Sequence, residues 1–399
     1  MSQASIELSI VLPCLNEERT LGICIQKARV FLEAQGLSGE VLVCDNGSTD
    51  RSVCIAHQLG ARVVHVPEKG YGAALRAGIR AAEGRFVIMG DSDDSYDFLA
   101  LAPFIDALRA GADLVIGNRF QGGIAKGAMP ALHRYLGNPL LSWLGRRFFR
   151  VSLGDFHCGL RAASVDSVRR LGLVCPGMEF ATELIAKAAL AGLHITEVPT
   201  TLRPDGRDRR PHLRTWRDGW RHLVFMLLMT PRWLFLAPGL VLTALGAMGL
   251  ALLGESPLTL GRLGLDIHSL LYCSGGLILG LQLLQFAVLV KWMGVASGMA
   301  GEPVWLRSLR RLASLEVALL IGLGLLVGGL TWSAALVRSW GAQGYAQLEP
   351  QAVMRSAIPA VTMMIVGLQA CAGAFLASAL GLALRSRRAA DRAGDLSGV

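Results

Sequence analysis

Short apolar runs alternate with amphipathic stretches over the first 117 residues. The apolar runs cover residues 9–12, 40–44, 62–66, 85–89 and 113–116, and the stretches between them lie near residues 17–36, 49–59, 71–82 and 97–110. Runs of this length suit buried strands, whereas longer stretches with one apolar face suit helices. The alternation predicts an α/β domain built on a doubly wound, mostly parallel sheet.

Two later stretches mix aromatic and basic residues in a helical pattern. One lies near residues 130–150 and the other covers residues 212–232. Helices of this composition suit the interface between a membrane and water. Either stretch could instead pack within the domain. We favour two interfacial helices, the first belonging to a domain of residues 1–211 and the second linking that domain to the rest of the chain.

Four long apolar segments follow, at about residues 233–253, 270–290, 313–335 and 357–384. Each is close to the roughly 20 residues that cross a hydrocarbon core. Basic residues gather between the second and third segments and after the fourth, at Lys291, Arg307, Arg310, Arg311, Arg385, Arg387, Arg388 and Arg392. Because such residues favour the cytoplasmic side, we expect the N-terminal domain and the basic tail of residues 385–399 to be cytoplasmic.

Composition supports an integral membrane protein. Of the 399 residues 52% are hydrophobic, and the mean hydropathy is +0.46, which is too apolar for an ordinary soluble chain. The first residues lack the pattern of a cleavable signal peptide, so we expect an inner membrane of bacterial type or its equivalent. The net charge of +9 suits an anionic membrane better than nucleic acid, since low-complexity basic tails are missing. Eight scattered cysteines without a C-x-x-C pair predict reduced thiols.

Carboxylates follow the fourth apolar run. Asp91, Asp93 and Asp94 come directly after residues 86–89, at the edge where open α/β sheets bind ligands. Like charges this close favour a divalent cation, and oxygen ligands favour Mg²⁺ or Mn²⁺. The alternative is a solvated loop in which an aspartate caps the next helix, and we expect Asp94 to be such a cap.

The ends of the first two runs also carry short polar residues, in residues 13–18 and 45–50. Their oxygens and backbone amides could bind a base and a ribose. They could equally form turns in which Ser48 or Thr49 caps the following helix.

Residues 13–18, 45–50, 69–74 and 91–93, in this order and spacing, resemble family-2 glycosyltransferases of the GT-A fold, and among them the polyprenyl-phosphate (dolichyl-phosphate) hexosyltransferases. The resemblance covers about residues 6–230. It implies that Asp91 and Asp93 bind the metal and take part in catalysis. It also implies a nucleotide pocket, lined by Pro13, Asn16, Glu17, Asp45 and Lys69. Asn46 departs from the pattern, since many relatives have aspartate there.

Arginines and two further carboxylates complete the predicted site. By resemblance, Arg119 and Arg134 contact the phosphate of a lipid acceptor, although surface salt bridges are the alternative. Asp155 and Glu183 position groups or act as a general base, but a phosphate monoester with a pKa near ~6 is already a nucleophile at neutral pH. Residues 203–210 are basic, and this loop could cover a diphosphate through Arg207, bind anionic lipid, or do both.

These observations predict a membrane-bound inverting glycosyltransferase. It would transfer a hexose from a nucleotide-diphosphate sugar to polyprenyl phosphate and so make a lipid-linked sugar donor. One alternative is a transferase acting on a glycerolipid or ceramide hydroxyl, and a weaker one is a carrier or flippase that only binds its ligand. The sequence leaves open the sugar, the choice between UDP and GDP, and whether the chain forms a homo-oligomer.

Overall fold

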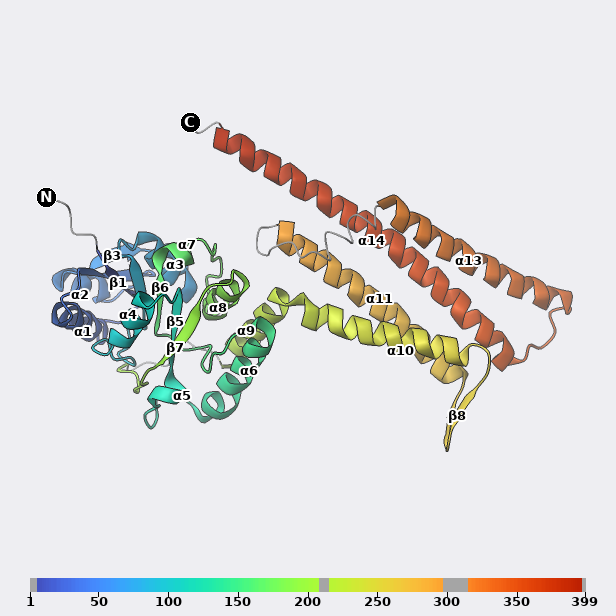
Figure 1. Ribbon diagram of the computed structural model, residues 1–399, viewed down its shortest axis with the longest axis horizontal. Coiled ribbons are helices and arrows are strands. Elements are labelled where there is room, and N and C mark those ends of the chain that lie inside the picture. The colour runs from blue at the N-terminus through green and yellow to red at the C-terminus, as the bar shows by residue number, and fades with distance from the viewer. Residues whose placement is uncertain (1–5, 208–214, 297–314, 397–399) are drawn as a thin grey trace. The chain divides into compact units, whose positions relative to one another are not determined.

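The computed structural model describes residues 6–207, 215–296 and 315–396 (Figure 1). The chain divides into two compact units, Met1–Thr230 and Pro231–Val399. The boundary lies after the stretch predicted as a linking helix, so that helix belongs to the first unit. All eight cysteines are free, as the sequence predicts.

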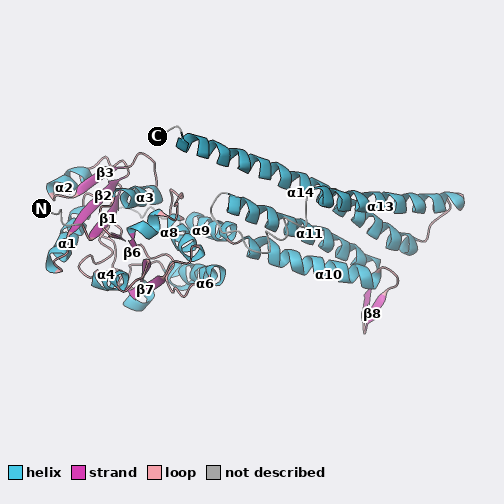
Figure 2. Ribbon diagram, turned by 45° about the horizontal axis from the view of Figure 1, so that its top comes forward, coloured by secondary structure: helices cyan, strands magenta, loops and turns pink. Residues whose placement is uncertain are grey.

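A seven-stranded sheet forms the centre of the first unit (Figure 2). Its strand order is β3-β2-β1-β4-β6-β5-β7. Only β6 runs antiparallel to its neighbours, so the predicted doubly wound, mostly parallel sheet is confirmed. The strands are β1 Leu8–Cys14, β2 Gly39–Asp45, β3 Arg62–His65, β4 Phe86–Met89, β5 Leu114–Asn118, β6 Arg161–Ser164 and β7 Ile195–Pro199.

The first four helices connect the strands where the amphipathic stretches predict them. Most of the helices pack on the sheet: α3, for example, contacts β1, β2 and β3, and α4 contacts β5, β6 and β7. Fully buried phenylalanines fill the core between these layers. The helices are α1 Leu21–Ala34, α2 Ser52–Gln58, α3 Tyr71–Ala81, α4 Ala102–Arg109, α5 Arg119–Gly122, α7 Val165–Arg169 and α8 Phe180–Leu190.

The strand register brings the predicted loops to one edge. Cys14 at the end of β1 lies beside Asp45 at the end of β2, and Val11 in β1 lies beside Met89 at the end of β4. Parallel strands end on the same side, so the chain leaves all three strands at the carboxyl edge. The sequence predicts this convergence correctly.

Both stretches predicted as interfacial helices are helical. A π-helical turn, η1 (His133–Gly137), continues into α6 (Asn138–Phe149), and α9 covers Thr215–Met229, with residues 212–214 outside the described part. One side of α6 packs on α8 and α9. The opposite side exposes large apolar residues, namely Leu132, Tyr135, Leu136, Leu140 and Trp143.

The second unit consists of helices long and apolar enough to cross a membrane. They pack chiefly as two pairs, α10 with α11 and α13 with α14, and the β8–β9 hairpin joins the first pair. The four candidate spans, Arg232–Leu253, Ile267–Gly294, Leu315–Ala342 and Pro350–Leu382, overlap the four predicted segments, with ends that differ by up to seven residues. The elements are η2 Arg232–Leu236, α10 Ala237–Leu253, β8 Leu258–Leu260, β9 Leu263–Leu265, α11 Ile267–Ala296, α13 Leu315–Ala342 and α14 Pro350–Leu396.

We expect Gly78→Ala to destabilise the first unit. A Cβ at Gly78 would lie 2.3 Å from Val11 Cγ1 and 2.8 Å from Cys44 Sγ, so α3 would have to move off the sheet at a cost of about 1–3 kcal/mol. Thermal unfolding of the full chain in detergent measures this. Gly219→Ala, in a helix with no neighbour within 4 Å of the new Cβ, is the control, and equal melting temperatures for the two variants would contradict the close packing.

Candidate active site

The loops after β1 and β2 are bonded to each other. The amide N–H of Asn16 donates to Ser48 Oγ at 2.9 Å, and Asn16 Oδ1 accepts from the Thr49 N–H at 2.7 Å. The residue before α2 is Arg51, whose side chain makes no cap, and Asp50 Oδ1 accepts from the Ser52 N–H at 2.9 Å. The alternative in which Ser48 or Thr49 caps the helix is therefore wrong, because these side chains instead bond to Asn16.

Asp45 lies inside this turn with its carboxylate buried. It accepts hydrogen bonds from the N–H groups of Gly47 at 3.3 Å and Ser48 at 2.9 Å, and His65 Nδ1 lies 3.4 Å away. Burial raises the pKa of Asp45, but the bonds from Ser48, His65 and Gly47 outweigh burial and lower the pKa below its usual value. Asp45 is therefore a firmly ionised, oriented acceptor at the predicted nucleotide pocket.

Asn46 shapes the neighbouring loop. Its Nδ2 donates to the carbonyl oxygens of Val66 at 3.1 Å and Glu68 at 2.7 Å, and its Oδ1 accepts from the Gly70 N–H at 2.7 Å. An aspartate could not donate these two bonds, which gives the departure from the family pattern a structural reason. Lys69 Nζ donates to the Asn46 carbonyl at 2.7 Å, so the lysine also lies at this edge.

Asp93 presents one oxygen to a cation. Its Oδ1 accepts from Ser95 N at 3.1 Å and Ser95 Oγ at 2.6 Å. Its Oδ2 lies 3.2 Å from Arg207 Nη1. Ser92, between the two aspartates, donates to the carbonyl of Pro13 at 2.7 Å and joins this turn to the end of β1.

Asp91 has a different environment. Tyr71 Oη donates to Asp91 Oδ1 at 2.9 Å, and a Cβ at Gly159 would lie 2.3 Å from Oδ2, so only glycine admits the carboxylate there. Burial, and then the charge of Asp93, raise the pKa of Asp91 to about 6. The sequence analysis did not identify Tyr71 or Gly159, although Tyr71 belongs to the motif at residues 69–74.

Asp94 does not cap the next helix. It has a φ of 60° and pairs with Lys27 Nζ of α1 at 2.7 Å, whereas α4 begins after Leu101 without a side-chain cap. The sequence prediction is wrong here, because the turn after Asp93 directs the third carboxylate toward α1.

Arg119 and Asp155 form a buried two-point ion pair. Arg119 Nε lies 2.6 Å from Asp155 Oδ2, and Nη2 lies 2.8 Å from Oδ1. The same carboxylate accepts from the N–H groups of Arg119 at 3.3 Å and His157 at 3.2 Å. Asp155 is 0% exposed. The carboxylate of Asp155 thus accepts hydrogen bonds from four donors, and two of these bonds orient the Arg119 guanidinium.

Glu183 and Arg134 contact other residues than the pairs described above. Glu183 is buried in α8, accepts from the N–H groups of Val174 at 2.9 Å and Cys175 at 2.8 Å, and pairs with Lys187 at 2.8 Å. Arg134 lies on η1 with its guanidinium 5.6 Å from the ring centre of Tyr135. In the described part of the chain, neither residue forms a hydrogen bond or an ion pair with Asp91 or Asp93.

Arg161 is a buried cation that sequence analysis missed. It donates to the carbonyl oxygens of Cys158 at 2.7 Å, Phe156 at 2.8 Å and Ala181 at 2.5 Å. These bonds fix the loop between Asp155 and Gly159. In the sequence, Arg161 is marked only by its place at the start of β6, a short strand that the sequence does not predict.

The acidic edge fits a divalent metal that shares its ligands with a substrate. Within residues 6–207, 215–296 and 315–396 no three His, Cys, Asp or Glu side chains converge as a complete site. Asp93 Oδ2 nevertheless already binds a cationic side chain, and burial and the charge of Asp93 raise the pKa of Asp91 beside it. Mg²⁺ and Mn²⁺ often complete such partial sites with phosphate oxygens and water.

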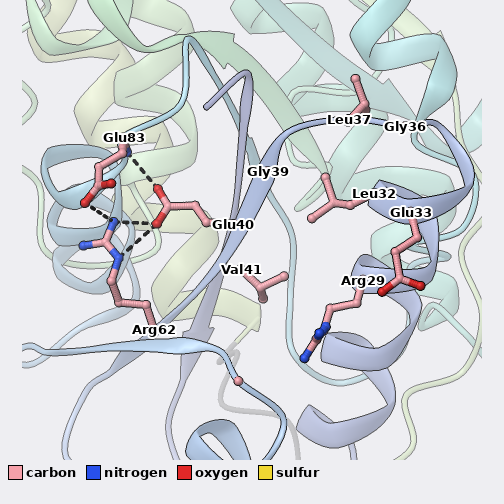
Figure 3. A pocket seen from close by; sticks show the side chains of 11 residues that line it. Arg29, Leu32, Glu33, Gly36, Leu37, Gly39, Glu40, Val41, Arg62 and Glu83 are labelled. Atoms are coloured by element: carbon pink, nitrogen blue, oxygen red, sulfur yellow. Dashed lines mark hydrogen bonds and ion pairs between the residues drawn. The ribbon is translucent and has the colours of Figure 1, made fainter. Parts of the chain in front are cut away.

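A cavity of about 550 Å³ lies at a different place, beside the N-terminal end of β2 (Figure 3). Its charged side chains bond to each other or to the backbone: Arg62 pairs with Glu40 and Glu83, and Arg29 donates to the carbonyl of Leu59. It contains none of the predicted site residues.

Family models agree with this geometry. The model for glycosyl transferase family 2 matches residues 9–172, and that for the family-2 C-terminal transmembrane region matches residues 288–381. The low-salt glycan biosynthesis hexosyltransferase Agl6 of Haloferax volcanii is 36% identical over 377 residues, covering 94% of this chain and 89% of the relative. The chain belongs to glycosyl transferase family 2. It is therefore an integral membrane glycosyltransferase with a GT-A domain.

Two further proteins are similar to this glycosyltransferase. A dolichyl-phosphate hexose transferase of Haloferax volcanii is 31% identical over 199 residues, covering 49% of this chain and 83% of the relative. The crystal structure of glucosyl-3-phosphoglycerate synthase from Mycobacterium tuberculosis with phosphoglyceric acid is 26% identical, covers 56% of this chain and 80% of that one, and aligns with a TM-score of 0.46.

We expect Asp91→Asn to stabilise the metal-free enzyme above pH 6. Because burial and the charge of Asp93 raise the pKa of Asp91 to about 6 in the folded state, ionisation of this carboxyl destabilises the fold as the pH rises from the usual range of a carboxyl pKa to about 6. The amide removes that cost, about 1–3 kcal/mol, so the variant should melt a few degrees higher at pH 7.5 and at the wild-type temperature at pH 4. Thermal unfolding with a chelator present measures this. Asp106→Asn, on the exposed side of α4, is the control, and equal melting temperatures at pH 7.5 would contradict the assigned environment.

Proposed function

We propose that this glycosyltransferase transfers a hexose from a nucleotide-diphosphate sugar to polyprenyl phosphate, with inversion at the anomeric carbon. The names of two relatives support the reaction class, since one is a hexosyltransferase and another a dolichyl-phosphate hexose transferase. The C-terminal spans suit an acceptor that lies in the membrane. Family membership favours a catalyst over a carrier.

The choice of acceptor rests on one observation: the two candidate general bases, Asp155 and Glu183, are both fully engaged in hydrogen bonds and ion pairs. Asp155 accepts four hydrogen bonds and Glu183 is held by two N–H groups and Lys187, and both are 0% exposed. A glycerolipid or ceramide hydroxyl needs a base to take its proton, whereas a lipid phosphate is largely dianionic above pH ~6. The site thus suits a nucleophile that brings its own charge, with Asp155 and Glu183 as positioning residues.

In this reaction a phosphate oxygen of the lipid attacks the anomeric carbon. The bond from that carbon to the diphosphate oxygen breaks, the nucleotide diphosphate leaves with the electron pair, and the configuration inverts. Lys69 and Arg207 would stabilise the negative charge that develops on the leaving group. A divalent metal bound by Asp91 and Asp93 would add its charge to this stabilisation. We assign Nη1 of Arg119 to the acceptor phosphate, with Arg134 as a second contact, since Nε and Nη2 bind Asp155.

The membrane-facing surface is assigned to η1 and α6. Their exposed apolar residues alternate with arginines, the pattern of a helix that lies in the headgroup region. In α9, Trp220 is likewise exposed, beside Arg217 and Arg221. Together with the basic residues between the second and third spans, this favours the cytoplasmic side for the GT-A domain and the C-terminus. Of these basic residues, Lys291 lies in α11, whereas Arg307, Arg310 and Arg311 lie outside the described residues.

Sugar transfer in detergent tests the metal and nucleotide assignment. Asp93→Asn should lower kcat at least about 100-fold with polyprenyl phosphate as acceptor, because it removes the oxygen that faces the cation. Asp106→Asn, the same change on the exposed face of α4, should keep full activity. Transfer that is insensitive to Asp93→Asn, or that persists in a chelator, would contradict the assignment.

Two variants separate a phosphate acceptor from a hydroxyl acceptor. If Asp155 and Glu183 only position other groups, at least one of Asp155→Asn and Glu183→Gln should retain measurable transfer, with the loss mainly in KM for the lipid when Asp155 is changed. A hydroxyl acceptor predicts that removal of the true base abolishes turnover. Assays with polyprenyl phosphate, diacylglycerol and ceramide distinguish these cases, and transfer to a neutral lipid alone would overturn the proposal.

A further inference from the structure

Arg207 lies among the acidic side chains of the donor site. Its Nη2 is 2.9 Å from Glu17 Oε1 and its Nε is 3.0 Å from Glu17 Oε2, a two-point pair. Its Nη1 is 3.2 Å from Asp93 Oδ2. One guanidinium thus joins the loop after β1 to the turn after β4.

The backbone before Arg207 holds it in this place. The Gly206 N–H donates to the carbonyl of Asp93 at 2.9 Å, and the Arg203 N–H donates to the carbonyl of Ser95 at 2.9 Å. Residues 202–207, which we call the strap, therefore run along the turn that carries the metal-binding carboxylate. The pairing of Arg207 follows from backbone register and is more than a chance surface contact.

The carboxylates need a cation here. Glu17 is 5% and Asp93 7% exposed, and two buried carboxylates without a positive neighbour would repel each other and lose hydration. Arg207 supplies that charge in the ligand-free enzyme, and the pKa of Arg207 is raised accordingly by Asp93 and Glu17, although burial lowers it. A metal ion would meet Asp93 through the same Oδ2 that Arg207 now contacts.

We propose that Arg207 is the resident cation of the empty donor site and competes with the divalent metal for Asp93. The inference rests on the proposed donor site at Asp91 and Asp93. Metal without nucleotide must displace the guanidinium, so it binds weakly. Metal with a nucleotide diphosphate gives the displaced guanidinium a new anionic partner, so the two ligands bind cooperatively. The strap would thereby keep the site from holding metal until the donor arrives.

Mn²⁺ binding to the full chain in detergent tests this, with free Mn²⁺ measured by electron paramagnetic resonance and no acceptor present. Without nucleotide, Arg207→Gln should bind Mn²⁺ at least about threefold more tightly than the wild type, because the competitor is gone. With UDP or GDP, whichever binds, the same variant should bind the nucleotide about tenfold more weakly. A purely structural salt bridge would not give these opposite signs.

Controls separate failure of the inference from failure of the donor site. Arg203→Gln removes a strap arginine that pairs with Asp97 and should leave both affinities at wild-type values. Asp93→Asn should abolish Mn²⁺ binding, and if it does not, the proposed metal site itself is wrong. If Asp93→Asn abolishes binding but Arg207→Gln binds Mn²⁺ no more tightly than the wild type, the site stands and the competition is refuted. Arg207→Met, which keeps an unbranched apolar stem but removes the charge, replaces the glutamine variant if that does not purify.

Discussion

The arrangement of the first unit depends on the carboxylates at the carboxyl edge of its sheet. Each of them is poorly hydrated and therefore needs a positive charge or hydrogen-bond donors beside it. Asp45 obtains backbone N–H groups, Glu17 obtains Arg207, and Asp93 obtains Ser95 and Arg207. Asp91 accepts a hydrogen bond from the Tyr71 hydroxyl, but burial and the charge of Asp93 raise its pKa. An added cation would therefore stabilise the ionised form of this carboxylate.

The segment from Asp155 to Arg161 connects this edge to the proposed acceptor side. Asp155 orients Arg119, and Gly159 lies against the carboxylate of Asp91. Arg161 donates to two carbonyl oxygens of the loop between them and to that of Ala181 in α8. Three residues therefore separate Asp155, which orients the proposed acceptor arginine, from Gly159, which admits the carboxylate of the proposed donor site. A displacement of this loop would disturb both halves of the reaction together.

The sequence predicts the first five strands along the chain, the helices between them and the four spans, because hydrophobic period and segment length depend on local patterns. It also places the polar loops at one edge, since parallel strands end together. It does not predict β6 or β7. The four residues of β6 run antiparallel between β4 and β5, and pairing direction depends on distant partners. The same holds for side-chain partners: Asp94 turns to Lys27 of α1, and Ser48 bonds to the loop of Asn16, across sequence separations that no local pattern encodes.

Arg207 and Tyr71 illustrate the same limit at the site. A basic loop predicts an interaction with phosphate, but only the fold brings Arg207 to Glu17 and Asp93, residues far earlier in the chain. A structure of the full chain with Mn²⁺ and a nucleotide diphosphate is the most direct test of the account. It should place the metal about 2.0–2.3 Å from Asp93 Oδ2, with Arg207 on the diphosphate and Tyr71 still bonded to Asp91. A metal bound elsewhere, with Arg207 still paired to Glu17 and Asp93, would contradict the account.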